Sequence, residues 1–201
     1  MTTRTAEEVL ALNIESMGEP LGRAFWHLNQ QILQLHLVWA QYKQLYGESE
    51  ETVHLLNETA GLFFMVVQDS LWDTVLLGIC KLTDPAQTFQ SQNLTIRSLP
   101  PLIADHDLSK RVSGLCDEAV LKAKFARVHR NKRIAHQDKT HIFDREAQPL
   151  GGISRRRVKE MLQAITAVMN AVNGFYFDST MFYDDIVAGG DAAWLVQKLK
   201  T

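Results

Sequence analysis

The sequence predicts an all-α protein, an antiparallel bundle of four to five main helices. Two observations support this fold class. Apolar residues recur at three- and four-residue steps along most of the chain, which is the period of amphipathic helices. No stretch shows convincing two-residue alternation and no segment is repeated, so neither a sheet nor a solenoid is expected. Amphipathic helices bury their apolar stripes against one another, and a bundle achieves this.

Length and charge narrow the class of protein. With 201 residues, of which 46% are hydrophobic, the chain is long enough to bury a substantial core as one domain. The formal net charge is −2, so the protein lacks the strongly basic balance of a general nucleic-acid coater. Any site for nucleic acid must therefore be a local patch.

The first two helices are delimited by local signals. Thr5 followed by Glu8 is a capping-box pattern that predicts a short helix running to Ser16. A long amphipathic helix should then begin at Pro20, which suits a first helical turn, and end at Gly47.

The third helix should be the hydrophobic spine of the bundle. Ser49 and the acids that follow it mark a start, and the helical pattern continues until Asp84. Its most apolar part, residues 62–82, contains Asp69 and Asp73, and two carboxylates in mid-span would be costly in lipid. We expect a buried core helix and no membrane contact.

The middle of the chain alternates between loops and helices. Residues 84–94 are polar and predict a loop, after which Thr95 caps a short helix that Pro100 breaks or restarts. A further helix should be capped near Ser109 and continue into a basic stretch ahead of Gln137. Between them, the ligand-type residues 105–107 fit a polar loop better than an ion site.

The last third of the chain contains two predicted helices. Ser154 opens the first, which ends near Gly174, and Asp191 caps a short C-terminal helix. The three arginines 155–157 lie in a first turn, where cations oppose the helix dipole, so they either bind phosphate or form a solvated helix start. All four tryptophans are expected to be packing anchors: Trp26, Trp39, Trp72 and Trp194.

Cysteine usage and the N-terminus both favour a cytoplasmic protein. Cys80 and Cys116 fall in helical patterns without metal-ligand spacing, so we expect reduced core thiols. The first 20 residues contain early acids and no sustained apolar stretch, unlike a secretory signal. No metal or cofactor is expected.

Basic residues are concentrated between residues 122 and 139, where Asp138 is the sole acid. They are Lys122, Lys124, Arg127, Arg130, Lys132, Arg133 and Lys139. A basic run on a helix is most often a solvated face. His129 and His136 lie within this run, and histidine exchanges protons near neutral pH, so the patch is also a candidate catalytic site.

The segment Arg130-Asn131-Lys132-Arg133-Ile134-Ala135-His136-Gln137-Asp138 resembles the signature of HEPN proteins. That signature is an arginine and a histidine separated by four to six residues, with a polar residue directly after the arginine, and Asn131 occupies this polar position. Together with the preceding FFMVVQDSLWDTVLLGICKLTDP and LTIRSL segments, it resembles more narrowly the abortive-infection U-type (AbiU2-like) branch. The resemblance covers about residues 20–175 and implies one HEPN-like helical domain, 1–201, with a C-terminal helical extension, 176–201.

The resemblance implies a metal-independent endoribonuclease that serves as a toxin or as a phage-defence effector. The residue chemistry agrees with ribonuclease activity. Cleavage of RNA by its own 2′-hydroxyl needs a base, an acid and fixed positive charge against the phosphorane. The candidate catalytic residues are Arg130, His136 and Asn131. Arg133, His129 and Asp73 are supporting candidates. An acid such as Asp73 is more often a partly buried structural residue, and His129 is equally well explained without a function. The candidate RNA phosphate ligands are Arg127, Lys132 and Lys139.

Helix geometry favours a site shared by two chains. On an ideal α-helix, Arg130 and His136 lie about 9 Å apart along the axis and about 120° apart around it, so they do not share a face. HEPN domains commonly dimerise so that two motifs line one cleft, and this resemblance implies a homodimer. Some relatives carry a tyrosine two residues after the motif histidine that an antitoxin partner modifies. Asp138 stands there, so that mode of neutralisation is not carried over to this chain, and a cognate antitoxin or defence partner is left open.

Two alternatives remain at this stage. The first is a non-catalytic HEPN-like module that binds RNA, a nucleotide or a protein partner. The second is a purely structural bundle, in which Arg130 and His136 would take part in unrelated salt bridges. A catalytic role for His136 separates the ribonuclease from both.

Overall fold

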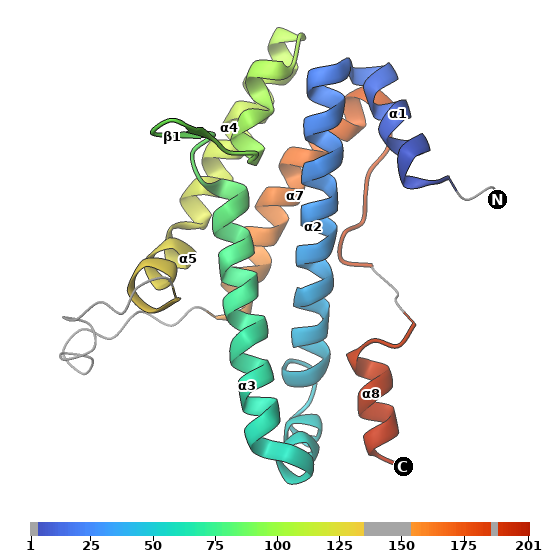
Figure 1. Ribbon diagram of the computed structural model, residues 1–201, viewed down its shortest axis with the longest axis vertical. Helices are drawn as coiled ribbons and strands as arrows, with labels where there is room; N and C mark the ends of the chain where they lie inside the picture. Colours follow the sequence, from blue (N-terminus) through green and yellow to red (C-terminus); the bar gives the residue numbers. More distant parts are fainter. Residues whose placement is uncertain (1–3, 135–153, 186–188) are drawn as a thin grey trace.

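The computed structural model describes residues 4–134, 154–185 and 189–201. Four long helices form an antiparallel bundle, as the sequence predicts: α2 (Glu19–Tyr46), α3 (Glu50–Thr83), α4 (His106–Lys122) and α7 (Arg155–Phe177). Figure 1 shows α2 and α3 side by side at the centre, with α4 and α7 forming the other pair. The remaining helices are shorter and lie around these four.

The bundle surrounds one large apolar core. Helices α2, α3, α4 and α7 each contribute fully buried side chains, among them Leu28, Ile79, Val112 and Val168. Close approach of helices requires small residues at two points. A Cβ on Gly22 would lie 2.6 Å from the backbone of Asn13 on α1, and one on Gly78 would lie 2.7 Å from Leu35 Cδ1.

Several predicted helix boundaries are confirmed by caps. The capping box of Thr5 and Glu8 opens α1 (Ala6–Met17), and Ser49 accepts from the Thr52 backbone N–H at the start of α3. Ser154 accepts from the Arg157 backbone N–H at the start of α7. Each cap satisfies a backbone donor that has no partner within its helix.

The start predicted for α4 near Ser109 is wrong. Asp105 caps the helix, because its carboxylate accepts from the Leu108 backbone N–H at 2.7 Å. Ser109 lies inside the helix and donates to the carbonyl of Pro100 at 2.8 Å. Residues 105–107 therefore begin a helix instead of forming an inter-helix loop.

The connection between α3 and α4 contains more regular structure than predicted. Residues expected to form a plain loop include a minimal antiparallel hairpin of β1 (Gln87–Thr88) and β2 (Ser91–Gln92), with Phe89 exposed at its tip. Two-residue strands are too short to show an alternating pattern. Two 3₁₀ turns follow, η1 (Ile96–Ser98), capped by Thr95 as predicted, and η2 (Pro100–Leu102).

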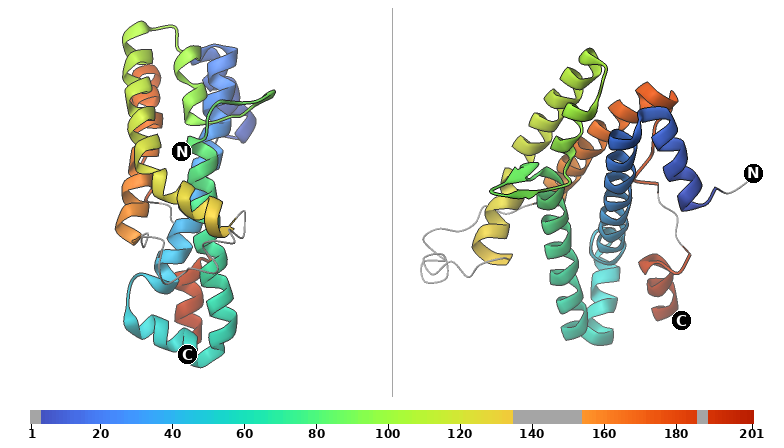
Figure 2. Two further views of the ribbon diagram at one scale, coloured as in Figure 1. Left: turned by 90° about the vertical axis from the view of Figure 1, so that its left-hand side faces the viewer. Right: turned by 45° about the horizontal axis from the view of Figure 1, so that its top comes forward.

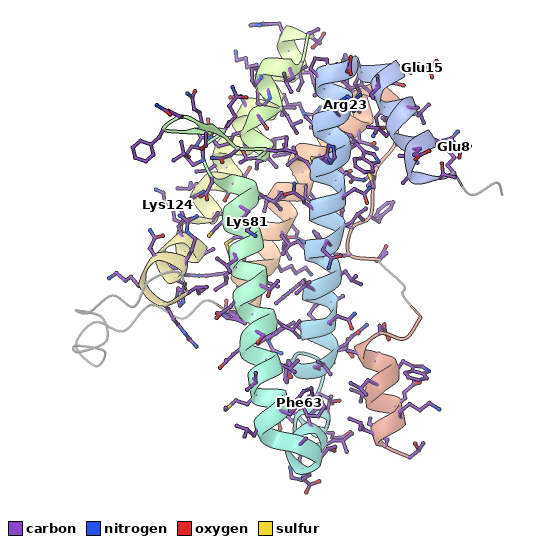
Figure 3. All side chains as sticks on the ribbon, viewed as in Figure 1. Glu8, Glu15, Arg23, Phe63, Lys81 and Lys124 are labelled. Atoms are coloured by element: carbon purple, nitrogen blue, oxygen red, sulfur yellow. The ribbon has the colours of Figure 1, made fainter. Side chains whose placement is uncertain are left out.

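The prediction that residues 62–82 are buried throughout is wrong for the first part of that stretch. Helix α3 has a non-helical backbone at Ala60, and just beyond it Leu62, Phe63, Met65 and Val66 are 52–75% exposed. Figure 3 shows Phe63 near the lower end of α3. Helix α3 is long and apolar enough to cross a membrane, but core helices of soluble proteins meet the same two criteria. In its most apolar window, 22% is buried.

The C-terminal residues return along α2 and end in α8 (Ala192–Leu199), which Asp191 caps as predicted. Asp191 also accepts from Gln44 at 2.8 Å, and the backbone of Ala192 donates to Gln41 at 2.8 Å. Ala192 and Val196 join a second small apolar cluster with Leu45, Leu56 and Phe64. Trp194, in contrast, is 53% exposed, so it is not the packing anchor that was predicted.

Candidate functional site

The basic segment forms a short, irregular continuation of α4. Helix α4 ends at Lys122 with Ala123 as its C-cap, where a continuous helix was expected. The short helix α5 (Lys124–His129) and the π-helical turn η3 (Arg130–Ile134) follow. Both pack against α3. Figure 2 shows them crossing that helix. Single π turns occur often at functional sites.

Asp84 at the C-terminal end of α3 binds two arginines of this segment. Its Oδ1 lies 3.2 Å from Arg127 Nε, and its Oδ2 lies 2.6 Å from Arg130 Nη1. All three side chains are 23–27% exposed, so the ion pairs are largely shielded from water. Asp84 therefore fixes both arginines against the end of α3.

Arg127 also completes the hydrogen bonding of that helix end. Its Nη2 donates to the carbonyl of Thr83 at 2.7 Å and to the Thr83 hydroxyl at 3.0 Å. The last carbonyls of a helix have no partners within it, and a cation there is favoured by the helix dipole. Arg127 thus ties α5 to α3.

A second carboxylate, Asp73, lies on the same face of α3 as Asp84. Eleven residues are about three helical turns, which brings the two side chains into one row. Burial raises the pKa of Asp73, an effect opposed by the charge of Arg133, strengthened by Asp69, and opposed also by His129. Of the three supporting candidates, His129 and Arg133 therefore both interact electrostatically with Asp73.

The cysteine between these carboxylates is not activated. Burial raises the pKa of Cys80 to about 11, despite the opposing charge of Arg130. Burial likewise raises the pKa of Cys116 to about 12, and its thiol donates to the carbonyl of Ile96 at 3.3 Å. Both are free and buried, as expected for core thiols, and both are protonated at neutral pH.

Comparison with known families identifies the chain. Residues 18–192 match the family of HEPN proteins described as AbiU2. The chain belongs to the AbiU2 family. No curated protein and no solved structure matches it significantly. This membership agrees with the resemblance seen in the sequence, and it makes the protein an HEPN module related to abortive infection.

The HEPN signature, residues 130–138, is only partly within the described residues. Arg130 and Asn131 begin η3, where Arg130 Nε donates to Asn131 Oδ1 at 3.1 Å and Asn131 is exposed. His136 and Lys139 lie outside the described residues. The described part of the signature is a π turn, and the geometry between Arg130 and His136 stays a prediction.

The remaining candidates lie at different depths. His129 is buried, at 9% exposure, whereas Arg133 is exposed and Lys132 is half-buried. Arg127 was predicted to bind phosphate, and its guanidinium is engaged by Asp84 and Thr83. Among the described residues, no group of three or more His, Cys, Asp or Glu side chains gathers as a metal site would require.

Sequence analysis missed Asp84 as a site residue and assigned it only to the end of a helix. Its contacts join residues 43 and 46 positions apart, which no local pattern reveals. One signal was available, because Asp84 follows Asp73 by three helical turns and both precede a basic segment.

The arginines of α7 are also engaged: Arg155 donates to the Tyr46 carbonyl, Arg156 pairs with Glu160, and Arg157 lies over the Phe125 ring at 3.7 Å.

Proposed function

We propose that this AbiU2 protein is a metal-independent endoribonuclease that acts as a toxin or phage-defence effector. The observation that carries the proposal is the placement of Arg130. Asp84 and Asn131 hold its guanidinium in a basic segment of a chain that belongs to an HEPN family. A guanidinium held in this way stabilises developing phosphorane charge without reorganising during the reaction.

The proposed reaction is an internal transesterification of RNA. The 2′-oxygen attacks the adjacent phosphorus and the bond from phosphorus to the 5′-oxygen breaks. A base takes the 2′-proton and an acid protonates the 5′-oxygen, which leaves a 2′,3′-cyclic phosphate and a 5′-hydroxyl. His136 supplies one of these proton transfers, Arg130 stabilises the phosphorane, and Asn131 binds the phosphate or orients the histidine.

The surrounding residues have supporting roles in this scheme. Arg133 and His129 both act electrostatically on Asp73, and His129 is the candidate for the second proton transfer. Arg127 positions α5, while Lys132 and Lys139 attract RNA phosphates.

A homodimer would bring two copies of Arg130 and His136 to one cleft. Sedimentation at micromolar concentration tests this, since a strict monomer contradicts a shared site.

Cleavage of labelled RNA in excess EDTA tests the activity. We expect the wild type to produce 2′,3′-cyclic phosphate ends, and His136→Ala to lose at least about 100-fold in rate because general acid–base catalysis contributes that much. His54→Ala is the matched control, since His54 is exposed and pairs with Glu58 on α3. Full activity in His136→Ala would contradict the mechanism.

The alternative function is a non-catalytic module that binds RNA, a nucleotide or a protein, and the Arg130–Asp84 ion pair alone is compatible with it. The two functions differ in turnover. A binding module predicts that folded wild type and His136→Ala bind RNA equally and that neither cleaves it. Expression in cells tests the toxin role, where growth arrest should require His136.

A further inference from the structure

A cavity of about 500 Å³ lies away from the motif, between the end of α2 and the start of α7. Four cationic side chains line it: Lys43 from α2, and Arg155, Arg156 and Lys159 from α7. Its volume lies within the range of roughly 300–1,000 Å³ that is usual for small-ligand sites. A smaller cavity of about 300 Å³ shares Gly47, Glu48 and Arg155 with it and continues over the turn between α2 and α3.

The positive charge of this cavity is only partly compensated. Arg155 donates to a backbone carbonyl, and Arg156 pairs with Glu160 in an exposed ion pair. In the part of the chain that the structure describes, neither Lys43 nor Lys159 has an ion-pair partner. Cations that converge from two helices repel one another, and those in the first turn of α7 also oppose its dipole. A bound anion would offset both costs.

Carboxylates also line this cavity. Asp184 accepts from His36 Nδ1 at 3.0 Å, and Asp185 and Glu48 are the other acids in the lining. Burial lowers the pKa of His36 more than Asp184 raises it, so the imidazole is neutral at neutral pH and adds no cation there. The lining of the cavity therefore combines cationic side chains, carboxylate hydrogen-bond acceptors and the buried indole of Trp39.

We propose that this cavity is a binding site for a small phosphate ester whose remaining part carries hydroxyl or amino donors. The phosphate lies against Lys43, Lys159 and Arg155, where charge-assisted hydrogen bonds bind it. The hydroxyl or amino groups donate to Asp184 and Asp185. Free inorganic phosphate would bind the cationic side chains but would offer no such donors to the carboxylates, so the ester should bind more tightly.

Calorimetric titration of the full-length protein at low ionic strength tests this site with three probes: inorganic phosphate, ribose 5-phosphate and AMP. We expect at least one ester to bind about tenfold more tightly than inorganic phosphate. Lys43→Gln and Lys159→Gln should each weaken that ester roughly tenfold, since a charge-assisted hydrogen bond is lost. Which ester binds more tightly distinguishes a sugar phosphate from a nucleotide.

Matched variants separate this site from general charge and from the motif. Lys110→Gln removes an exposed lysine on α4 and should leave binding unchanged, and so should Arg130→Ala, whatever its effect on RNA cleavage. Asp185→Asn should weaken the ester but not inorganic phosphate. Thermal unfolding checks that each variant is folded. Absence of binding by wild type at millimolar probe, or equal weakening by Lys110→Gln, overturns the proposal.

Discussion

The two halves of α3 have similar apolar composition and different surroundings. In the second half, Val75, Leu76 and Ile79 are at most 1% exposed. Asp84, at its end, binds Arg127 and Arg130 of residues 124–134, the motif segment. In the first half, Leu62, Phe63, Met65 and Val66 are 52–75% exposed. The difference lies in the neighbours, because the second half joins the main core with α2, α4 and α7 and also packs against α5 and η3. Apolar sequence alone therefore does not determine where the core lies.

Among substitutions that compare the two halves, the largest loss of folding stability is expected in the core of the second half. Ile79→Ala should lower the free energy of unfolding by about 2–5 kcal/mol, since it leaves a cavity at a fully buried position. Chemical denaturation measures this loss, with Leu62→Ala as the control from the exposed half. Equal losses at the two positions would contradict the comparison.

The next effect concerns the ion pairs that join α3 to the motif segment. Asp84→Ala should cost about 1–3 kcal/mol, because Arg127 and Arg130 would remain largely buried without their carboxylate. Denaturation of this variant is compared with Asp69→Ala, which removes an exposed acid from the same helix. A loss no larger than that of Asp69→Ala would show that Asp84 does not anchor the segment.

A smaller effect should appear in the pH dependence of stability. Burial raises the pKa of Asp73 in the folded state, so folding is favoured when this carboxyl is protonated. That contribution is present below the unfolded pKa, near 3.8, and is lost as pH rises through the higher folded value. Asp73→Asn should therefore gain stability relative to wild type across this interval. A stability difference that stays constant or falls with pH would oppose this interpretation.

The smallest effect is expected on the exposed half of α3. Phe63→Ser combined with Val66→Ser should change the free energy of unfolding of the isolated chain by no more than about 0.5 kcal/mol, because solvent already reaches both side chains. Denaturation at low protein concentration measures it. A loss comparable to that of Ile79→Ala would mean that this surface is covered in solution.

Local signals made much of the fold predictable. The caps Thr5, Ser49, Ser154 and Asp191 each act on a backbone N–H three residues away, so a short sequence pattern contains the whole interaction. Ser109 has the residue type of a cap, but its hydroxyl donates to the carbonyl of Pro100 and does not cap the helix. The same residue type serves both purposes, and its neighbours decide which.

The site was predictable in composition but not in connectivity. Sequence identified Arg130, Asn131, His129 and Arg133 as a group because they are contiguous, and Asp73 only as a helix-spaced acid. The pairing of Asp84 with two arginines depends on how α5 packs against α3, which is a tertiary property. Roles for His136 and Lys139 stay predictions, since both lie outside the described residues.

The contact of α8 with α2 has a consequence for the order of folding. Gln41 and Gln44 bind residues about 150 positions later in the chain, whereas α2 and α3 are adjacent in sequence. Contacts between distant positions form slowly, because a long loop must close first. On the ribosome, the small cluster around Leu45, Leu56 and Phe64 therefore stays open until residues 192–199 have been synthesised. Docking of α8 would then close this cluster after α2 and α3 have already paired.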